Sequence, residues 1–69
     1  MALAIAASIS PREQQILQLV CAGLSNREIG ARCSVSASTV KTHLENIYRK
    51  LGVNSRTQAV AQAQALQLV

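Results

Sequence analysis

The sequence predicts an all-α fold, a bundle of four helices around a single hydrophobic core. The chain has 69 residues, of which 49% are hydrophobic, and a chain of this size has room for one core only. Four segments each open with a serine that is followed by a helix-start pattern. After each start, apolar residues recur three or four positions apart, which places them on one face of a helix. No segment shows the strict apolar and polar alternation that is typical of a half-buried strand.

The first predicted helix begins at residues 10–13 (SPRE). Serine is favoured at an N-cap and proline at the first helical position, and a glutamate at the third helical position can bond back to the cap amide. We expect the helix to run to about Ala22, because Gly23 provides the left-handed residue that commonly ends a helix. The residues expected to face the core are Ile16, Leu17 and Val20.

The second predicted helix is short, spanning about residues 26–33, and follows another capping-box pattern in residues 25–28 (SNRE). Ile29 and Cys33 lie one turn apart and are expected to share its buried side. Gly30 lies inside this helix, where glycine is less favourable than alanine by about 0.5–1 kcal/mol. We therefore expect Gly30 to make the domain less stable than alanine would.

The third predicted helix is the longest and spans about residues 37–51. Ser36 is its expected N-cap, and Gly52 is expected to stop it. Its apolar residues keep a helical period over the whole length, which gives the clearest amphipathic pattern in the chain. The residues on this core stripe are Val40, Leu44, Ile47 and Leu51.

The fourth predicted helix starts at residues 55–58 (SRTQ), once more a capping-box pattern, and is expected to continue to near Leu68. One apolar face is expected to complete the core, and its residues are Ala59, Val60, Ala63 and Leu66. A second, alanine-rich face would let another copy of the chain approach closely. The candidate contacts of this weak homodimer are Ala61, Ala65 and Leu68.

The charge balance favours a polyanionic partner. Seven lysines and arginines against three acidic residues give a net charge of +4 and a pI of about 9.8. Residues 1–8 are interpreted as a leader or linker remnant, because this apolar stretch lacks the positive charge of a signal peptide and is too short to span a bilayer. We therefore expect no membrane partner and a cytoplasmic location.

The residue types argue against an enzyme and against a bound metal or other cofactor. A zinc site in a small domain needs about four clustered ligands, whereas His43 lies apart from the two widely spaced cysteines, Cys21 and Cys33. Both cysteines are expected to be small buried apolar side chains rather than a disulfide. No acid/base pair or activated nucleophile can be identified.

The second and third predicted helices are joined by only three residues, 34–36, which is the layout of a helix-turn-helix. In that motif the second helix can lie in the major groove of DNA. When the core stripe of the third helix is turned inward, Lys41 lies on one flank, and His43 and Lys50 lie on the other. The residues that then face outward are Ser38, Thr42, Glu45, Asn46 and Arg49.

Three of these side chains are suited to contacting bases. Lys41 can donate to O6 and N7 of guanine, Glu45 can accept from N4 of cytosine, and Thr42 can contact the methyl group of thymine. Donors around this surface can bind phosphates, which fixes the register of the protein on the duplex. The candidate backbone contacts are Asn26, Arg27, Ser36, Ser38, Thr39, His43, Arg49, Lys50 and Arg56.

Each of these residues also has a purely structural interpretation. A polar helix face is often only solvated, and Glu45 can pair with Arg49 one turn later for about 0.2–0.5 kcal/mol. Lys50, near the end of its helix, can be a favourable cation at the negative end of the helix dipole. A single histidine such as His43 is more often a surface or packing residue than a ligand.

Four motifs occur in a specific order, and together they resemble the LuxR/GerE-type DNA-binding domain over about residues 9–66. They are residues 10–13, residues 23–29 (GLSNREI), residues 38–44 (STVKTHL) and residues 50–53 (KLGV). Residues 40–52, followed by Ser55, Arg56 and a last helix rich in glutamine and alanine, look most similar to the C-terminal domain of MalT-like transcription regulators. Three positions depart from the family pattern, namely Gly30, Cys33 and Ser34.

The resemblance implies one LuxR-type helix-turn-helix domain over residues 9–69. Residues 37–51 would be the recognition helix in the major groove, and the last helix would be the dimer contact. By position, Lys41, Thr42 and Glu45 match the base-contacting residues of the family. Backbone contacts are common in the family at the positions of Thr39, His43 and Arg56.

The expected function is sequence-specific binding of double-stranded DNA as the output domain of a bacterial transcription regulator. In such regulators a sensory part precedes this domain, and RNA polymerase is a further candidate partner. Two alternatives are a promoter-binding domain like region four of a sigma factor, and a helical protein-docking module. The fourth helix argues against the first, and a steep salt dependence of duplex binding would argue against the second.

Overall fold

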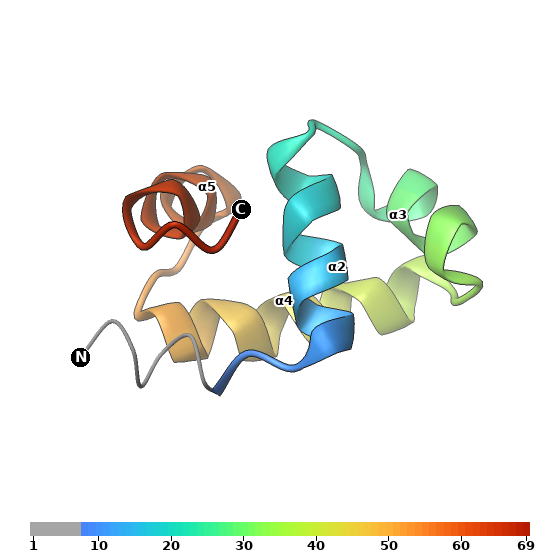
Figure 1. Cartoon of the computed structure of the whole chain (residues 1–69). Coiled ribbons are helices and arrows are strands. Elements are labelled where there is room, and N and C mark those ends of the chain that lie inside the picture. Colours follow the sequence, from blue (N-terminus) through green and yellow to red (C-terminus); the bar gives the residue numbers. More distant parts are fainter. Residues whose placement is uncertain (1–7) are drawn as a thin grey trace.

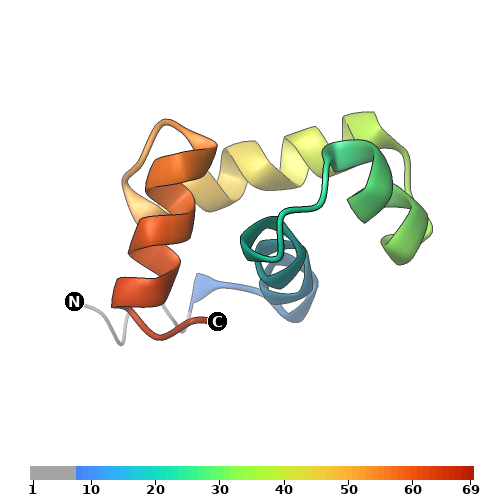
Figure 2. The ribbon, with the colours of Figure 1, turned by 90° about the horizontal axis from the view of Figure 1, so that it is seen from above.

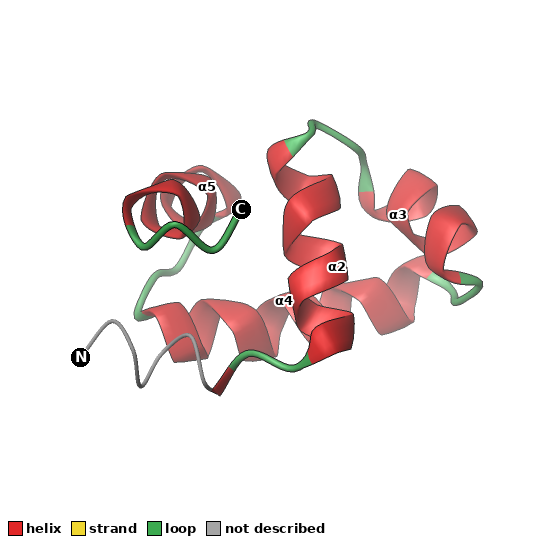
Figure 3. Cartoon of the chain, viewed as in Figure 1, coloured by secondary structure: helices red, strands yellow, loops and turns green. Residues whose placement is uncertain are grey.

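The computed structural model describes residues 8–69, and within them it consists of helices joined by short turns and loops (Figure 1, Figure 3). The helices, labelled as in Figure 1, are α2 (Pro11–Cys21), α3 (Asn26–Cys33), α4 (Ala37–Leu51) and α5 (Arg56–Ala65). The predicted all-α fold is confirmed. Residues 1–7, which make up most of the predicted leader, lie outside the described residues. No helix in the described part combines the length and the apolar character needed to cross a membrane.

α4 is the longest helix, and the other three pack along it (Figure 1). α2 crosses α4 and contacts all three of the other helices. α3 packs toward the start of α4 and α5 toward its end, which the view from above also shows (Figure 2). α3 and α4, joined by residues 34–36, form the predicted helix-turn-helix and leave one long side of α4 uncovered.

Each helix in residues 8–69 begins at a serine whose hydroxyl accepts a hydrogen bond from the third helical amide. The first two predicted capping boxes are complete, because Glu13 and Glu28 accept from the cap amides at 2.9 Å. At α5 the return bond is shifted by one residue. Gln58 accepts from the backbone amide of Asn54 at 3.0 Å, instead of from the cap amide of Ser55.

Each of α2, α3, α4 and α5 is also followed by a residue in the left-handed conformation, with nearby amides bonded back to carbonyls of the last turn. This is the Schellman arrangement, which satisfies carbonyl groups that the helix itself leaves unpaired. Glycine adopts the left-handed conformation at little cost, whereas other residues strain the backbone. The four residues are Gly23 (φ 92°), Ser34 (φ 59°), Gly52 (φ 71°) and Gln67 (φ 57°).

The end of α5 differs from the prediction. The helix stops at Ala65 instead of continuing to near Leu68, because the left-handed Gln67 turns the chain back. The amide of Leu68 then bonds to the carbonyl of Ala63 at 2.8 Å, and the Gln14 side chain donates to the Leu68 carbonyl. Leu68 is only 9% exposed and belongs to the core. Its assignment to the outer face of the last helix was wrong.

The core lies where the four helices meet and contains every residue of the predicted inward stripes of α2, α3 and α4. From α5, Ala59 and Ala63 are buried, and Val60 and Leu66 are partly buried against them. Cys33 is buried as predicted, Cys21 is half-buried, and both are free thiols. The buried apolar residues are Ile16, Leu17, Val20, Ile29, Cys33, Val40, Leu44, Ile47, Leu51, Ala59, Ala63 and Leu68.

Gly30 has a packing role that its helix propensity does not reveal. A Cβ atom added at this position would lie 2.6 Å from the carbonyl oxygen of Val35, far inside normal contact distance. The amide of Val35 donates to the Gly30 carbonyl at 2.9 Å, which holds the turn against the helix. Alanine would therefore have to push this turn away, and the expectation that Gly30 is simply a weak point of α3 was wrong.

Candidate nucleic-acid interface

One long face of α4 is exposed to solvent, opposite the buried stripe of Val40, Leu44, Ile47 and Leu51. We call this surface the outer face of α4. It contains all three predicted base contacts together with two of the predicted backbone contacts. Its residues are Ser38, Lys41, Thr42, Glu45 and Arg49. The helical period thus identified the exposed side of α4 from the sequence alone.

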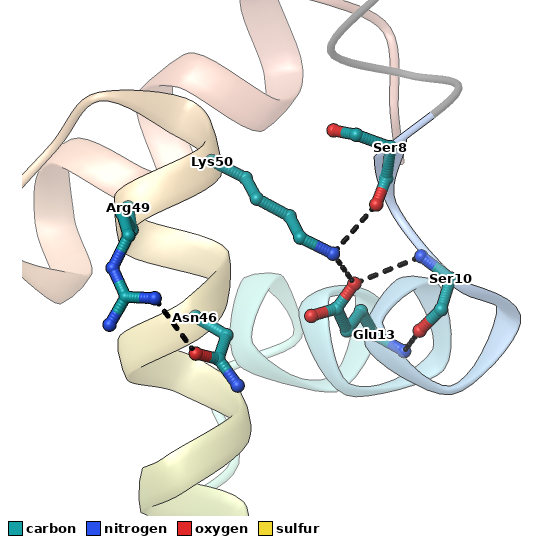
Figure 4. Close-up of polar contacts among 6 residues, drawn as sticks. All are labelled: Ser8, Ser10, Glu13, Asn46, Arg49 and Lys50. Carbon is teal, nitrogen blue, oxygen red and sulfur yellow. Dashed lines mark hydrogen bonds and ion pairs between the residues drawn. The ribbon is translucent and has the colours of Figure 1, made fainter.

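Lys41 and Glu45 lie one turn apart on this face and keep their charged groups free. Among the residues that the structure describes, neither side chain makes a hydrogen bond or an ion pair. The alternative pairing of Glu45 with Arg49 is not formed. Arg49 instead has Asn46 as its neighbour, at a long 3.4 Å between Nη1 and Oδ1 (Figure 4). Both a donor and an acceptor are therefore available to a partner of α4.

Thr42 uses its hydroxyl within α4. Its Oγ1 donates to the carbonyl of Ser38, one turn earlier, at 3.2 Å. This back-bond is a common way for threonine to satisfy its hydroxyl in a helix. The donor capacity of Thr42 is therefore occupied, whereas its methyl group remains at an exposed position.

At the start of α4, the two hydroxyl residues Ser36 and Thr39 are bonded to each other. Ser36 accepts from the Thr39 amide at 3.1 Å, and its Oγ lies 3.0 Å from the Thr39 hydroxyl. Both residues are exposed, so they can also meet a partner at the positive end of the helix. Two further predicted phosphate contacts are accessible to a partner, since Arg27 is exposed and His43 is only half-buried.

Arg56 ties the start of α5 to the start of α3. Its Nη1 donates to the carbonyl of Leu24 at 2.9 Å, and its Nη2 donates to Oδ1 of Asn26 at 2.6 Å. Sequence reasoning treated Asn26 and Arg56 as two separate phosphate contacts. The structure brings them together as one unit in which the asparagine holds the guanidinium.

A shallow groove of about 240 Å³ runs between α4 and this Asn26–Arg56 unit. We call it the α4 groove. It contains two residues that sequence reasoning did not select, the core residue Leu44 and the half-buried Tyr48. Tyr48 lies two turns after Lys41 on the same flank of the helix, and this spacing was the signal available in the sequence. The lining residues are Asn26, Lys41, Leu44, Glu45, Tyr48 and Arg56.

Lys50 is engaged inside the molecule (Figure 4). Its Nζ lies 2.6 Å from the Glu13 carboxylate and 2.7 Å from the carbonyl oxygen of Ser8, both of which it binds across a long span of sequence. Burial acts to raise the pKa of Glu13, but the hydrogen bonds from Lys50 and Ser10 and the Lys50 charge together hold that pKa below its usual value. The prediction of Lys50 as a phosphate contact is therefore corrected to an internal ion pair between α4 and α2.

Two of the three carboxylates are likewise occupied away from the outer face of α4. Glu13 pairs with Lys50, and Glu28 caps α3, where hydrogen bonds from the backbone and side chain of Ser25 hold its pKa low. Glu45 is the remaining carboxylate and lies among the cations of the outer face. Within residues 8–69, no group of three or more His, Cys, Asp or Glu side chains is arranged to hold a metal ion.

The short helix α3, the tight turn and the long exposed helix α4 can be compared with the domains of known protein families. A family model described as "Bacterial regulatory proteins, luxR family" matches residues 7–63, which is most of the chain. This chain belongs to the LuxR family. It is thus a DNA-binding helix-turn-helix domain of bacterial transcription regulators and not an enzyme.

Comparison with known proteins confirms the predicted similarity to MalT. The chain is 48% identical over 58 residues to the HTH-type transcriptional regulator MalT of Serratia proteamaculans (strain 568), covering 84% of this chain and 6% of MalT. It is 52% identical over 52 residues to the protein YhjB of Escherichia coli (strain K12), covering 75% of this chain and 26% of YhjB. The chain thus spans a small part of these proteins.

Solved structures of two response regulators contain a domain with the same fold. The response regulator ChrA of a heme-sensing two-component system superposes with a TM-score of 0.87 at 48% identity, over 90% of this chain and 31% of ChrA. The response regulator StyR gives a TM-score of 0.85 at 36% identity, over 93% of this chain and 32% of StyR. The helices of residues 8–69 therefore have the same arrangement as a domain of these two response regulators.

Proposed function

We propose that this domain binds specific sequences in double-stranded DNA with α4 in the major groove. The observation that carries the proposal is the pair of unpartnered charges on the outer face of α4, Lys41 and Glu45. A free cation next to a free carboxylate is poorly explained as a stabilising feature, because the two make no ion pair. It is well suited to base edges, which present acceptors on guanine and a donor on cytosine.

In this proposal Lys41, Thr42 and Glu45 contact bases. Lys41 donates to guanine, Glu45 accepts from cytosine, and the methyl group of Thr42 packs on thymine. Phosphates are held around them, so that the register of α4 on the duplex is fixed. Lys50 is left out because it is held by Glu13. The proposed backbone contacts are Asn26, Arg27, Ser36, Ser38, Thr39, His43, Arg49 and Arg56.

We further propose that α5 supports a weak dimer that forms on DNA. Ala61 and Ala65 are exposed and lie four residues apart, so a second helix can approach closely along them. Leu68 is not part of this surface because it is buried. A two-fold dimer would bind half-sites about one turn of DNA apart.

The domain is proposed to act as the output part of a longer cytoplasmic regulator, with residues 1–8 linking it to a sensory part. This is supported by the small share of MalT and YhjB that the chain covers. RNA polymerase is a proposed partner of the DNA-bound state. The two alternatives, a sigma-like domain and a protein-docking module, lose their support because the chain belongs to the LuxR family.

The proposal is tested by selecting duplexes from a random pool and measuring their affinity in a salt series. Log affinity is expected to fall linearly with log salt concentration, by about 0.9 for each phosphate neutralised. Lys41→Ala is expected to relax the preference at one base position at a cost of about 1–3 kcal/mol, whereas Arg49→Ala weakens binding to all sequences about equally. A flat salt response and no enriched sequence would contradict the proposal.

A further inference from the structure

We propose that the α4 groove holds one phosphate group of the DNA backbone, and that Tyr48 is a phosphate contact. The inference builds on the proposed function, because it adds a contact to the same DNA-binding surface. It rests on three observations about the groove: a fixed guanidinium, an unpartnered phenol hydroxyl, and a size and charge that suit a single phosphate.

The guanidinium of Arg56 is held in place before any ligand arrives. Two of its nitrogens bind the Leu24 carbonyl and the Asn26 side chain, at 2.9 and 2.6 Å. A guanidinium has five N–H donors, so three remain for a ligand, and Arg56 lines the groove. A cation fixed in this way loses little side-chain entropy on binding an anion, in contrast to a free surface arginine.

The hydroxyl of Tyr48 makes no hydrogen bond with any residue in the described part of the chain. The side chain is half-buried and lines the same groove as Arg56 and Lys41. A half-buried tyrosine usually directs its hydroxyl to a partner, because the ring packs and the polar end is left to bond. Tyrosine is also a known type of phosphate donor in DNA complexes.

The groove has the size and charge for a single phosphodiester. At about 240 Å³ it is smaller than the pockets that enclose drug-sized ligands, which are about 300–1,000 Å³. The groove is lined by two cations, Lys41 and Arg56, and by one carboxylate, Glu45, so its lining carries a net positive charge at pH 7. Lys41 and Glu45 also lie on the outer face of α4, so a phosphate in the groove would lie next to the base contacts.

The decisive variant is Tyr48→Phe, which removes one hydroxyl and no charge. Its affinity for a mixed-sequence duplex is expected to fall about three- to tenfold, the worth of one hydrogen bond. The slope of log affinity against log salt is expected to stay unchanged, because no phosphate loses a neutralising cation. Thermal unfolding of the variant checks that the fold is intact. Unchanged affinity with an intact fold would overturn the inference.

A double-variant cycle tests whether Tyr48 and Arg56 hold the same phosphate. Arg56→Lys keeps the charge and loses the forked donor geometry. If both side chains bind one phosphate, the double variant is expected to lose less affinity than the sum of the single losses. Arg12→Lys is the matched control, because Arg12 also donates to a backbone carbonyl, that of Cys33, but lies outside the groove. Additive losses with Arg56→Lys would overturn the shared site.

Nuclear magnetic resonance separates duplex phosphate from free phosphate. The ring resonances of Tyr48 are expected to shift on addition of the duplex, and to stay unchanged with sodium phosphate against sodium chloride at matched ionic strength. A shift with inorganic phosphate alone would overturn the assignment to the DNA backbone. The proposed function is contradicted by a different result, namely a parent domain that shows no salt-dependent binding to the duplex. If the parent binds and Tyr48→Phe leaves the affinity unchanged, only the proposed contact of Tyr48 is contradicted.

Discussion

At the scale of single residues, the hydrogen bond of the Thr42 hydroxyl limits which atoms of this side chain can contact a base. Since this hydroxyl donates to the Ser38 carbonyl, the methyl group is the free part. Thr42→Val keeps the methyl group and is expected to keep the base preference of the parent. Thr42→Ser removes it and is expected to lose about fourfold in preference for thymine, which corresponds to about 0.8 kcal/mol for one buried carbon. Competition between duplexes that differ at one base pair measures both.

The opposite ranking would contradict this assignment. If Thr42→Ser kept the preference and Thr42→Val lost it, the hydroxyl would be the group that contacts DNA, and the bond to Ser38 would be given up in the complex.

Glu45 is the carboxylate that the outer face of α4 presents to a polyanion. Glu45→Gln removes a like charge and is expected to raise affinity for mixed-sequence duplex about three- to tenfold at about 0.1 M salt. The preference for the selected sequence is expected to fall, because the acceptor for cytosine becomes weaker. Filter binding with mixed and selected duplexes measures the two effects.

Salt provides the control for Glu45→Gln. Near 1 M salt the Debye length is about 3 Å, so the gain on mixed sequence should nearly vanish. A gain that persisted there would point to a cause other than charge repulsion.

Tyr48, which the sequence did not single out, and the bond between Asn26 and Arg56 both depend on a neighbour from another helix. Lys41, Thr42 and Glu45 were placed on the exposed face because helical periodicity is local. The roles of Tyr48 and Asn26 follow from the position of Arg56, which is 30 residues away from Asn26 in sequence. Periodicity carries no information on such a distant partner.

At the scale of elements, the helix ends show where stability can be gained. Ser34 ends α3 with φ at 59°, a conformation that is strained for any residue with a Cβ atom. Ser34→Gly is expected to raise the free energy of unfolding by about 0.5–1 kcal/mol, the relieved strain minus the greater entropy of glycine in the unfolded chain. Urea denaturation measures the change.

Ser34→Ala serves as the comparison, because alanine keeps the Cβ atom. It is expected to be no more stable than the parent. If alanine stabilised the domain as much as glycine, strain at this position would not be the cause.

Local sequence signals predicted the helices well. Serine caps and apolar periods predicted α2, α3 and α4, and stopping glycines predicted the ends of α2 and α4, because each of these signals acts within a few residues. The end of α5 was mispredicted because Gln67 adopts the left-handed conformation without being a glycine. Its turn is stabilised by burial of Leu68 and by the bond from Gln14, both of which are tertiary contacts.

At the scale of the whole molecule, side chains connect helices that are distant in sequence. Lys50 and Glu13 are 37 residues apart and join the end of α4 to the start of α2. Arg56 joins α5 to α3, two helices that share no close backbone packing. Both cations were predicted as DNA contacts, Lys50 from its place on α4 and Arg56 also from its position in the family resemblance. A sequence does not show that Lys50 is already paired with Glu13.

The paired carboxylates make stability depend on pH. The pKa of Glu13 is lower in the folded chain than its usual value, so the folded state binds fewer protons than the unfolded state in the acidic range. The stability from this group is complete above the unfolded pKa and is lost as the pH falls through the folded one. We expect the free energy of unfolding to decrease from about pH 5 to about pH 3, as measured by urea denaturation.

Glu13→Gln tests which carboxylate is responsible. This variant is expected to be less stable than the parent at pH 7 and to show a smaller decrease toward pH 3. The decrease that remains is expected from Glu28, whose pKa is also lowered. An unchanged pH profile in the variant would show that the pair with Lys50 contributes nothing to acid sensitivity.

The close contact at Gly30 has a geometric consequence for DNA recognition. With no side chain at that point, the backbone around Val35 rests directly on α3. A methyl group added at Gly30 would push the turn away from α3 and would be expected to change the angle between α3 and α4. The missing carbon atom therefore permits the close packing of the turn on α3, and under the proposed function this packing would set the angle at which α4 meets a duplex.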